Sequence, residues 1–509
     1  MSPSGGRTIS TSVNGPVVLT SSDNPLTITS TGAVTSTGNK VDGVDGPSGT
    51  TWTISNAGRV ASAGGYGVSL GGPGIITNTG SIAGQYGIVL QAGGSITNAL
   101  NASISGTAGT GIWAGGASTT VKNDGSITGT SRGVLLTAGG NVTNDAGASI
   151  SAGGDAGVFI LGNTGTLNNG GVITAPATNS GGVYFENGGM ITNQAGGSIL
   201  GKSFGAFIEG GFGTLVNAGS ITSSVYSGFV FGLGGTLTNS VGGSISGGSN
   251  GVYTKYRAAA SVTNSGTITG MGTSSAGVDL ADGGSITNKA GGLIAGAGDG
   301  AFASGASCTV TNYSTISGTN SSGVALEAGG SITNAASAFI SGKVSGIFSN
   351  GEPVTIANSG SINATGGAGT DLEAGGTVTN VSGASITGSQ MGMFVTGGAG
   401  VVTNTGAISG PYGTVLEDGG SVANNSGGSI SGTTTAVFFQ GAPGTLTNSG
   451  VISAATSGGT GADIEAGGSV INNSGASLSG ASFGIFVSGG AGTSRTPAAS
   501  PAPITLAST

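Results

Sequence analysis

An asparagine that ends a GSITN-like segment recurs along almost the whole chain and strongly limits the folds that it can adopt. Residues 326–342, LEAGGSITNAASAFISG, contain one copy, which ends at Asn334. The copies place an Asn at nineteen positions with a mean spacing of about 23 residues. These positions are Asn56, Asn78, Asn98, Asn123, Asn144, Asn169, Asn193, Asn217, Asn239, Asn264, Asn288, Asn312, Asn334, Asn358, Asn380, Asn404, Asn424, Asn448 and Asn472. One repeated unit therefore builds nearly the whole chain, and we expect Ser30 to take the Asn position one coil earlier.

Each repeat contains three short segments in which apolar and polar residues alternate. In residues 327–349 they read GSITN, SAFISG and SGIFS, with Gly-rich corners between them. Alternation over three to five residues indicates β-strands, and Gly and Asn allow abrupt corners. The repeat therefore predicts an all-β fold: a right-handed parallel β-helix of about twenty coils with three strands per coil.

The recurring Asn has a physical role in such a stack. Identical amide side chains in register can form hydrogen bonds from one coil to the next. We expect the loss of one internal Asn to cost little stability. A polar residue in place of Ile332 or Ile386, which are predicted to point inward, should cost several kcal/mol.

A second, longer period is superimposed on the first. From Asn98 onward, the next apolar residue follows the Asn alternately by six and four residues, as in Asn98 to Ile104 and Asn123 to Ile127. The full unit is therefore a pair of coils of about 46 residues. The two extra residues of the six-residue corner should bulge outward at every second coil.

The paired unit also carries one aromatic residue at a fixed place. These residues are Trp113, Phe159, Phe207, Tyr253, Phe302, Phe348, Phe394, Phe438 and Phe486. The intervening coils have Leu135, Tyr184, Val230, Asp279, Ala325, Asp371, Val415 and Asp463 near the equivalent position. We favour an inward aromatic column, which requires the longer corner to shift the register by one residue. An outward-facing stripe is the alternative, since Asp cannot lie unpaired in a dry core.

Composition excludes several classes of function. Histidine is absent, which removes Ser-His-Asp and Cys-His catalysis and the common zinc sites. Eleven basic residues against nineteen acidic ones argue against nucleic-acid binding. The single Cys308 cannot form an internal disulfide, and no apolar run is long enough for a membrane helix. We expect no metal, no cofactor and no membrane insertion by this chain.

Carboxylates are the remaining candidates for catalysis. The best pairs are Asp371 with Glu373 and Asp463 with Glu465, because residues two apart on a strand project from the same face. Asp279 with Asp282 is a looser relative, and Glu327 and Glu417 lie at the same corner without a preceding Asp. No pair is unique, so we expect solvated edges and no catalytic residues. Residues 366–374 and 458–466 partly match a calcium-binding repeat, but their spacing excludes a shared ion.

Hydroxyl side chains form a second patterned surface. In GSITN the Ile should point inward, which leaves Ser or Thr on the outside. The outward pairs are Ser95 and Thr97, Thr236 and Thr238, Ser285 and Thr287, Ser331 and Thr333, and Thr445 and Thr447. Such a face could bind glycans or order ice-like water, although Thr is also an ordinary residue of exposed strands.

With these repeats in view, the chain resembles the β-helical passenger domains of bacterial autotransporters over roughly residues 8–490. Residues 12–38, SVNGPVVLTSSDNPLTITSTGAVTSTG, are similar to the first coils of such passengers. The resemblance implies export and display at the cell surface, with a role in adhesion, aggregation or biofilm formation. The C-terminal barrel of that family and a signal peptide are not legible in the sequence. We therefore expect either a passenger fragment or a protein that uses another route.

The sequence predicts three regions and one main function. Residues 1–50 should cap the stack, residues 51–490 should form the repeats, and residues 491–509 should be a Pro-rich flexible tail. We expect a non-catalytic, secreted or cell-surface scaffold that binds glycans, other surface molecules or copies of itself. A carbohydrate-active enzyme and a glycan- or ice-binding hydroxyl face are the alternatives.

Overall fold

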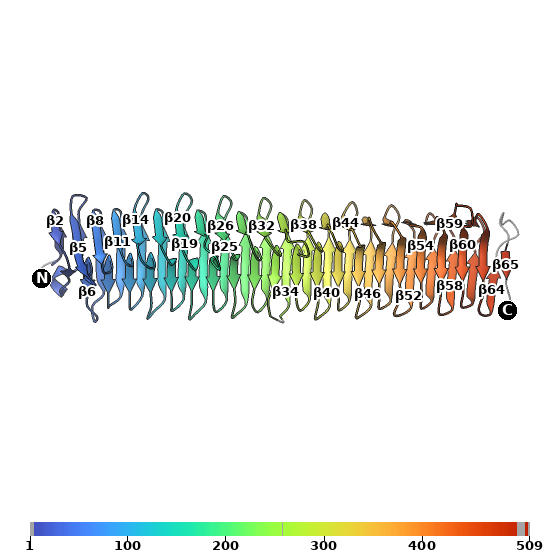
Figure 1. Cartoon of the computed structure of the whole chain (residues 1–509), viewed down its shortest axis with the longest axis horizontal. Coiled ribbons are helices and arrows are strands. Elements are labelled where there is room, and N and C mark those ends of the chain that lie inside the picture. The colour runs from blue at the N-terminus through green and yellow to red at the C-terminus, as the bar shows by residue number, and fades with distance from the viewer. Residues whose placement is uncertain (1–4, 257, 496–503, 507–509) are drawn as a thin grey trace. The chain divides into compact units, whose positions relative to one another are not determined.

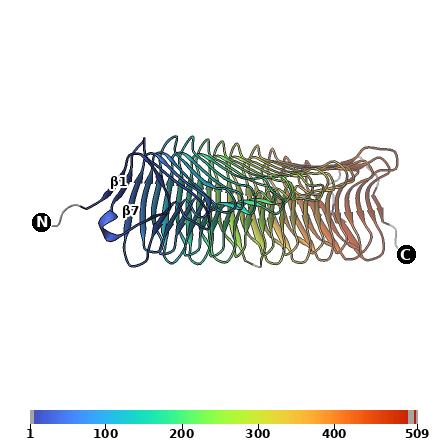
Figure 2. The same ribbon diagram turned by 60° about the vertical axis from the view of Figure 1, so that its left-hand side comes forward.

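The chain is an all-β parallel solenoid of about 21 turns with about 23 residues per turn. The computed structural model describes residues 5–256, 258–495 and 504–506, and it divides into two compact units, Met1–Gly248 and Ser249–Thr509. In both units short parallel strands stack coil upon coil, as Figures 1 and 2 show. The predicted fold class, repeat length and number of strands per coil are confirmed.

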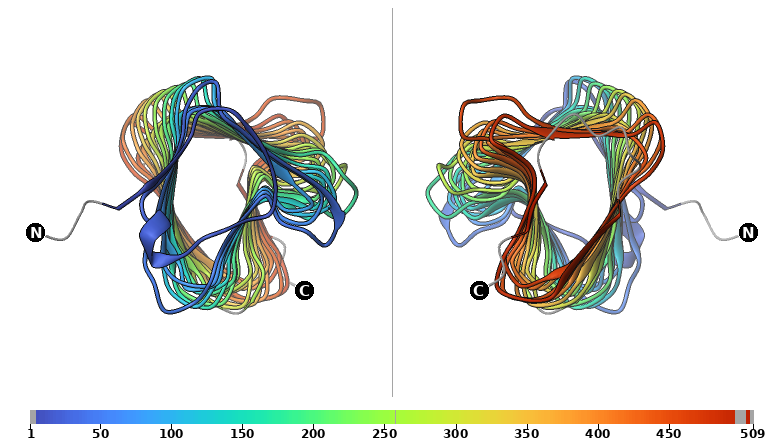
Figure 3. Two further views of the ribbon diagram at one scale, coloured as in Figure 1. Left: turned by 90° about the vertical axis from the view of Figure 1, so that its left-hand side faces the viewer. Right: turned by 90° about the vertical axis from the view of Figure 1, so that its right-hand side faces the viewer.

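One coil of the second unit illustrates the architecture. It contains β43 (Gly330–Asn334), β44 (Phe339–Gly342) and β45 (Ser345–Ser349). Each strand pairs in parallel only with equivalent strands of the coils before and after it, so the coils build a first, a second and a third sheet. Figure 3, which looks along the coils, shows the three sides that these sheets form.

Neighbouring coils are in register within each unit, apart from a shift between Ser36 and Asn39 where β5 (Ala33–Asn39) pairs with β8 (Arg59–Gly64). In the second unit β43 pairs with β40 (Cys308–Asn312) and β46 (Val354–Asn358), so Ile332 lies opposite Val310 and Ile356. In the first unit β13 (Gly94–Asn98) pairs in the same way with β10 (Gly74–Asn78) and β16 (Thr119–Asn123). Identical positions of the repeat therefore form continuous columns within each unit.

The core is a stack of inward apolar columns. Ile340 and Ile347 are completely buried, and Ile332 is almost so. Ile386 on β50 (Ser385–Gly388) is completely buried as well. The inward placement of Ile332 and Ile386 is confirmed, because alternate residues of a strand point to opposite faces.

The recurring Asn forms a buried hydrogen-bonded ladder. Asn334 Nδ2 donates to Asn358 Oδ1 at 2.9 Å and to the backbone oxygen of Ser361, on the coil of Asn358, at 3.1 Å. The same amide-to-amide bond links Asn56 to Asn78 in the first unit, at 2.8 Å. The ladder is thus confirmed, but Ile28 and not Ser30 lies opposite Asn56. Because Ile28 has no donor in its side chain, Asn56 Oδ1 has no partner.

Two kinds of corner alternate between the first and second sheets. The longer corner, such as Asn144 to Ile150, contains a tight turn in which Ala148 N donates to Asp145 O. Gly147 in this turn has φ +85°, and Ala146 and Gly147 are exposed. The register of the second sheet is kept, since Ile127 lies opposite Ile150. The two extra residues therefore bulge outward as predicted, without displacing the strands that follow.

The predicted terminal regions also contain strands. Residues 1–50 include β1 (Arg7–Ile9), β4 (Leu26–Ile28) and a 3-10 turn, η1 (Ser21–Asp23), and β4 pairs with β7 (Trp52–Asn56). Residues 491–509 include β64 (Gly492–Arg495) and β65 (Ile504–Leu506). The rest of the predicted tail, residues 496–503 and 507–509, lies outside the described residues. In the described part of the chain, no helix has the length and apolarity needed to cross a membrane.

Candidate functional site

One column of side chains on the third sheet combines aromatic rings, aliphatic groups and carboxylates, and we call it the outer column. In the first unit it contains Ser69 (β9, Val68–Leu70), Val89 (β12, Ile88–Leu90), Trp113 (β15, Ile112–Ala114), Leu135 (β18, Arg132–Leu136), Phe159 (β21, Ala156–Ile160), Tyr184 (β24, Gly181–Phe185), Phe207 (β27, Phe204–Ile208) and Val230 (β30, Phe229–Phe231). Consecutive members lie directly opposite each other.

The second unit has an outer column at the equivalent positions of its third-sheet strands. There it contains Tyr253 (β33, Val252–Thr254), Asp279 (β36, Val278–Leu280), Phe302 (β39, Ala301–Ala303), Ala325 (β42, Val324–Leu326), Phe348 (β45), Asp371 (β48, Ala368–Leu372), Phe394 (β51, Met391–Val395), Val415 (β54, Tyr412–Leu416), Phe438 (β57, Thr435–Phe439), Asp463 (β60, Thr460–Ile464) and Phe486 (β63, Phe483–Val487).

The outer column faces away from the core. Val158 and Ile160, on either side of Phe159, are completely buried, so Phe159 points outward and is half-buried. The inward aromatic column that we favoured from the sequence is therefore wrong. The longer corner ends in a bulge and leaves the register of the third sheet unchanged, as the pairing of Leu135 with Phe159 shows.

Aromatic rings of the first unit contact each other along the outer column. The rings of Phe159 and Tyr184 meet edge to face at 4.7 Å, and those of Tyr184 and Phe207 at 5.3 Å. The guanidinium carbon of Arg132 lies 4.9 Å from the centre of the Phe159 ring. The Tyr184 hydroxyl donates a hydrogen bond to Glu209. Phe159 and Tyr184 are half-buried, whereas Phe207 is only 7% exposed, so the first two rings are held in fixed positions on the outer face.

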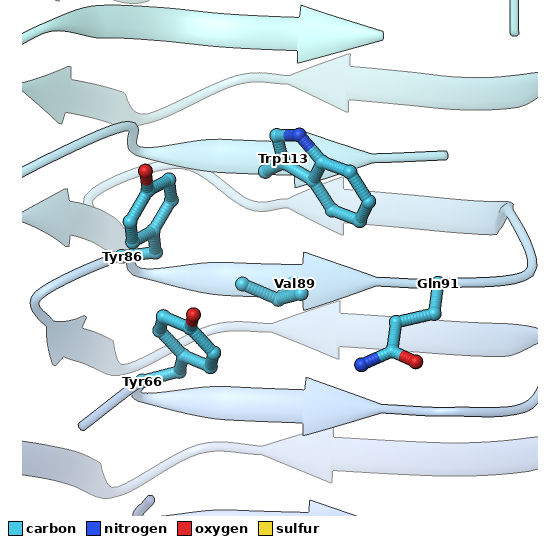
Figure 4. A pocket seen from close by; sticks show the side chains of 5 residues that line it. All are labelled: Tyr66, Tyr86, Val89, Gln91 and Trp113. Carbon is cyan, nitrogen blue, oxygen red and sulfur yellow. The ribbon is translucent and has the colours of Figure 1, made fainter. Parts of the chain in front are cut away.

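A pocket of about 340 Å³ opens beside the outer column in the first unit. Tyr66, Tyr86, Val89, Gln91 and Trp113 line it. Figure 4 shows the two tyrosines at one end of the strands, Val89 and Trp113 between, and Gln91 at the other end. The rings of Tyr66 and Tyr86 meet edge to face at 5.3 Å.

This pocket suits a ligand with one apolar face and several hydroxyl groups. Trp113 and the tyrosines offer flat apolar surfaces, and the phenol groups and the Gln91 amide offer donors and acceptors. A few polar groups on an aromatic surface are typical of small-molecule sites. A saccharide ring combines the apolar and the polar contacts that these side chains can make.

In the second unit the outer column contains three carboxylates between aromatic rings. Burial raises the pKa of Asp279 to about 6, an effect that Asn250 opposes by donating a hydrogen bond of 2.8 Å and that Asp299 and Glu327 reinforce. Burial likewise raises the pKa of Asp371 and of Asp463 to about 6, with support from the negative charges of Glu373 and Glu465, respectively. Each of the three carboxylates is therefore mostly ionised at neutral pH and lies in an unusually apolar place.

The predicted carboxylate pairs are brought together only in part. Asp371 lies in β48, and Glu373 is the first residue after that strand. In the same way, Asp463 lies in β60 and Glu465 is the first residue after it. Glu373 and Glu465 are exposed, in agreement with a solvated edge, but Asp371 and Asp463 are half-buried between rings. The description as a simple solvated edge is therefore wrong for the two aspartates, because the flanking rings shield them from water.

The other candidate carboxylates, Asp282, Glu327 and Glu417, follow strands of the third sheet. Asp282 follows β36 and is half-buried, with Asp279 three residues before it on the strand. Glu327 is exposed and Glu417 is half-buried, and both follow a strand of the third sheet directly. These carboxylates line the border of the outer column in the second unit.

The predicted hydroxyl face lies on the outside of the first sheet. Ser95 and Thr97 flank the buried Ile96 on β13, and Ser331 and Thr333 flank Ile332 on β43. The exposed residues Ile75, Met190, Val401 and Ile471 interrupt this face. The hydroxyl groups are thus outward as predicted, but they form shorter arrays than the repeat alone suggests.

Two features bear on metals and thiols. Cys308 is buried, and burial raises the pKa of its thiol to about 12, so it behaves as a small apolar core residue. Within residues 5–256 and 258–495, no group of three or more potential metal ligands was found. Five of the nine residues in the calcium-like segment 366–374 belong to β48, so they are part of a sheet and do not form a loop.

The pocket residues Tyr66, Tyr86 and Gln91 were not predicted from the sequence. A usable signal exists, because Tyr66 and Tyr86 each precede a Gly at the corner before a strand of the third sheet. Phe204, Tyr412 and Phe483 occupy comparable positions, and Phe204 and Phe483 both contact the outer column. An aromatic residue before this Gly therefore marks additional rings beside the column.

Comparisons with known proteins add no assignment: no family model, no curated protein and no solved structure matches the chain. The resemblance to autotransporter passengers therefore stays a prediction.

Proposed function

We propose that the protein is a non-catalytic binding scaffold whose outer column holds extended saccharides at a cell surface or in a secreted form. The observation that carries this proposal is the outward-facing column on the third sheet, which sets aromatic side chains at repeated places and in the first unit borders the open pocket at Trp113. Adhesion, aggregation or biofilm formation are the processes in which such a scaffold would act.

The binding mechanism is multivalent. Each half-buried ring of the outer column offers one shallow contact, and in the second unit the aromatic position recurs at every second coil. Linked weak contacts raise the effective concentration of each further contact and give high avidity without a deep pocket. Rings that are already fixed by their neighbours lose little conformational freedom when a ligand binds.

Export to the cell surface is the part of the proposal that rests on the resemblance to autotransporter passengers. The parallel solenoid and the low content of cysteine are compatible with it. Protease treatment of intact producing cells, followed by detection with an antibody against this chain, tests it. Degradation without cell lysis supports display at the surface, and full protection contradicts it.

Saccharide binding can be tested with the purified chain and a panel of soluble oligosaccharides, including cellulose and chitin fragments. We expect saturable binding to at least one of them and a loss of at least tenfold in affinity for Trp113→Ala combined with Phe159→Ala. Met190→Ala, an exposed side chain on the first sheet, is the matched control and should leave the affinity unchanged. Equal losses in both variants would contradict a site on the outer column.

A carbohydrate-active enzyme is the second candidate, and one observation favours it. Asp371, with a pKa raised to about 6, lies two residues from the exposed Glu373, and an acid and a base in one site need two carboxyl groups in such different surroundings. An assay of new reducing ends during incubation with polysaccharides separates the two functions. Release that is abolished in Asp371→Asn would support the enzyme and contradict the scaffold.

A further inference from the structure

The three carboxylates of the outer column have the same surroundings. Asp279 lies in register between Tyr253 and Phe302. Asp371 lies between Phe348 and Phe394. Asp463 lies between Phe438 and Phe486. The sequence interval between successive aspartates is 92 residues, which corresponds to four coils. The second unit therefore repeats one arrangement of ring, carboxylate and ring three times.

A polar side chain accompanies each carboxylate. It lies three residues before the aromatic residue of the preceding coil, at Asn250, Ser345 and Thr435. Asn250 Nδ2 donates to Asp279 Oδ2 at 2.8 Å. Ser345 is only 1% exposed, and its hydroxyl lies close enough to Asp371 to lower the pKa of that carboxyl, against the larger effect of burial. A polar group in contact with the carboxylate is thus part of the arrangement at Asp279 and at Asp371.

In the described part of the second unit, two of the three carboxylates have an oxygen without a hydrogen-bond partner. Asp371 Oδ1 and Asp463 Oδ1 are buried and accept no hydrogen bond. Within residues 258–495, neither carboxylate takes part in an ion pair. An ionised carboxylate in an apolar place is costly unless a cation or several donors satisfy it. Asp371 and Asp463 are half-buried as residues, so an external donor can approach each carboxylate from the solvent side.

We propose that these three places bind ammonium groups carried by an amino-sugar chain. An ammonium group is attracted by the faces of aromatic rings and forms strong hydrogen bonds with a carboxylate, and both kinds of group are present at each place. The proposal rests on the proposed function and specifies its ligand in the second unit as a saccharide that carries free amines.

The spacing favours a stiff polymer. At about 4.8 Å per coil, four coils separate successive carboxylates by roughly 19 Å. A saccharide chain that stacks its apolar ring faces on the intervening rings can reach several places with a small loss of conformational entropy. A flexible basic peptide would lose more, so the regular spacing points to the amino sugar.

The surrounding charge supports a cationic ligand. Residues 249–509 contain eleven of the nineteen acidic residues but only five of the eleven basic ones. Glu327, Glu373, Glu417 and Glu465 directly follow strands of the third sheet and lie beside the outer column. These negative charges attract a polycation over a distance of about 8 to 10 Å at physiological salt.

The experiment compares oligomers of glucosamine with oligomers of N-acetylglucosamine of the same length, using the full chain and calorimetry at 0.15 M salt and pH 7.5. The two ligands differ mainly in the charge of the amine. We expect the glucosamine oligomer to bind at least tenfold more tightly. Equal affinities, or tighter binding of the acetylated oligomer, would overturn the proposal.

Two double variants separate the sites from the general charge. Asp371→Asn and Asp463→Asn together should weaken binding of the glucosamine oligomer at least tenfold. Glu352→Gln and Asp418→Asn together remove the same charge elsewhere in the unit and should change the affinity less than twofold. Similar losses in the two double variants would overturn the assignment. Unchanged circular dichroism and melting temperature verify that each variant is folded.

The remaining outcomes distinguish this inference from the proposed function. Binding of neutral oligosaccharides that depends on Trp113 and Phe159, without a preference for free amines, would overturn the inference and leave the proposed function standing. Binding of polylysine as tight as that of the glucosamine oligomer would overturn the saccharide as the specific ligand. A chain that binds none of these oligosaccharides would contradict both.

Discussion

The amide of Asn334 donates its hydrogen bond to Asn358 in the interior of the coil stack, where both side chains are completely shielded from water. Asn358 in turn donates to Asn380 Oδ1 at 2.8 Å and to the backbone oxygen of Ser385 at 3.0 Å. Each member of the ladder therefore satisfies groups on the next coil. The expectation that one internal Asn can be lost at little cost does not fit this burial.

Asn358→Ala should lower the free energy of unfolding by about 2–5 kcal/mol, because it removes one hydrogen bond of the buried Asn334 amide and leaves Asn380 Oδ1 without its donor in the core. Urea denaturation followed by circular dichroism measures the change. Asn363→Ala on the outer face of β47 (Ser361–Ala364) is the control and should stay within about 0.5 kcal/mol of the unaltered protein. Equal midpoints for the two variants would contradict a structural role of the ladder.

Ile386→Asn should destabilise the protein by about 3–5 kcal/mol, because it removes a buried aliphatic side chain and adds an unsatisfied amide. Thr387→Asn makes a similar change at the neighbouring exposed position. The loss should therefore be confined to Ile386→Asn in thermal and urea unfolding. A large loss for Thr387→Asn and none for Ile386→Asn would reverse the assignment of inner and outer faces.

The long corners allow a test of backbone strain. Gly383 has φ +81° and an added Cβ would meet no atom within 4 Å, so Gly383→Ala should cost about 1–2 kcal/mol through the backbone alone. Ser337 occupies the equivalent turn with φ +66°, and Ser337→Gly should therefore stabilise the protein. Melting temperatures of the two variants should shift in opposite directions, and a shift in the same direction would contradict this explanation.

Stability should increase as the pH falls from 7 to 5. Asp279, Asp371 and Asp463 have a pKa of about 6 in the folded state, above the usual 3.8, so the folded protein binds more protons than the unfolded chain in this range. Protonation therefore favours folding. Asp45, whose pKa burial also raises, acts in the same direction. Asp23 and Asp145 have lowered pKa values, and their contributions are lost only at pH values below this range.

The measurement is the urea midpoint between pH 5 and pH 7. The triple variant Asp279→Asn, Asp371→Asn and Asp463→Asn should show a much smaller dependence, and at pH 7 it should be at least as stable as the unaltered protein. The control triple variant Asp282→Asn, Glu352→Gln and Asp418→Asn should keep the dependence. A midpoint that falls steadily from pH 7 to pH 5 in the unaltered protein would contradict the burial of these carboxylates.

The fold could be predicted from the sequence because every coil repeats the same local pattern. The GSITN segment fixes the inward Ile, the outward hydroxyls and the ladder Asn at once, as β43 shows. The burial of the Asn could not be inferred, because a polar residue at a corner is compatible with solvent as well as with a ladder. The direction of Phe159 depended on whether the long corner shifts the register, which is decided by the turn at Gly147.

The candidate site was only partly predictable for a similar reason. The alternation of aromatic residues with Asp371 and Asp463 was visible in the sequence, but their mutual shielding depends on exact pairing between coils. The pocket combines Tyr66, Tyr86 and Trp113 from three successive coils. Its formation depends on how side chains from a corner and a strand lean together, which the repeat does not specify.

The central claim is that the outer column is the binding surface, and Trp113 reports on it directly. The protein has two tryptophans, and Trp52 is almost completely buried, so Trp52→Phe leaves the pocket residue Trp113 as the single indole. When this variant is titrated with an oligosaccharide that binds in calorimetry, the Trp113 emission should shift to shorter wavelength. The ligand concentration at the midpoint of this shift should equal the calorimetric Kd. Emission that stays constant while calorimetry shows saturated binding would contradict the claim.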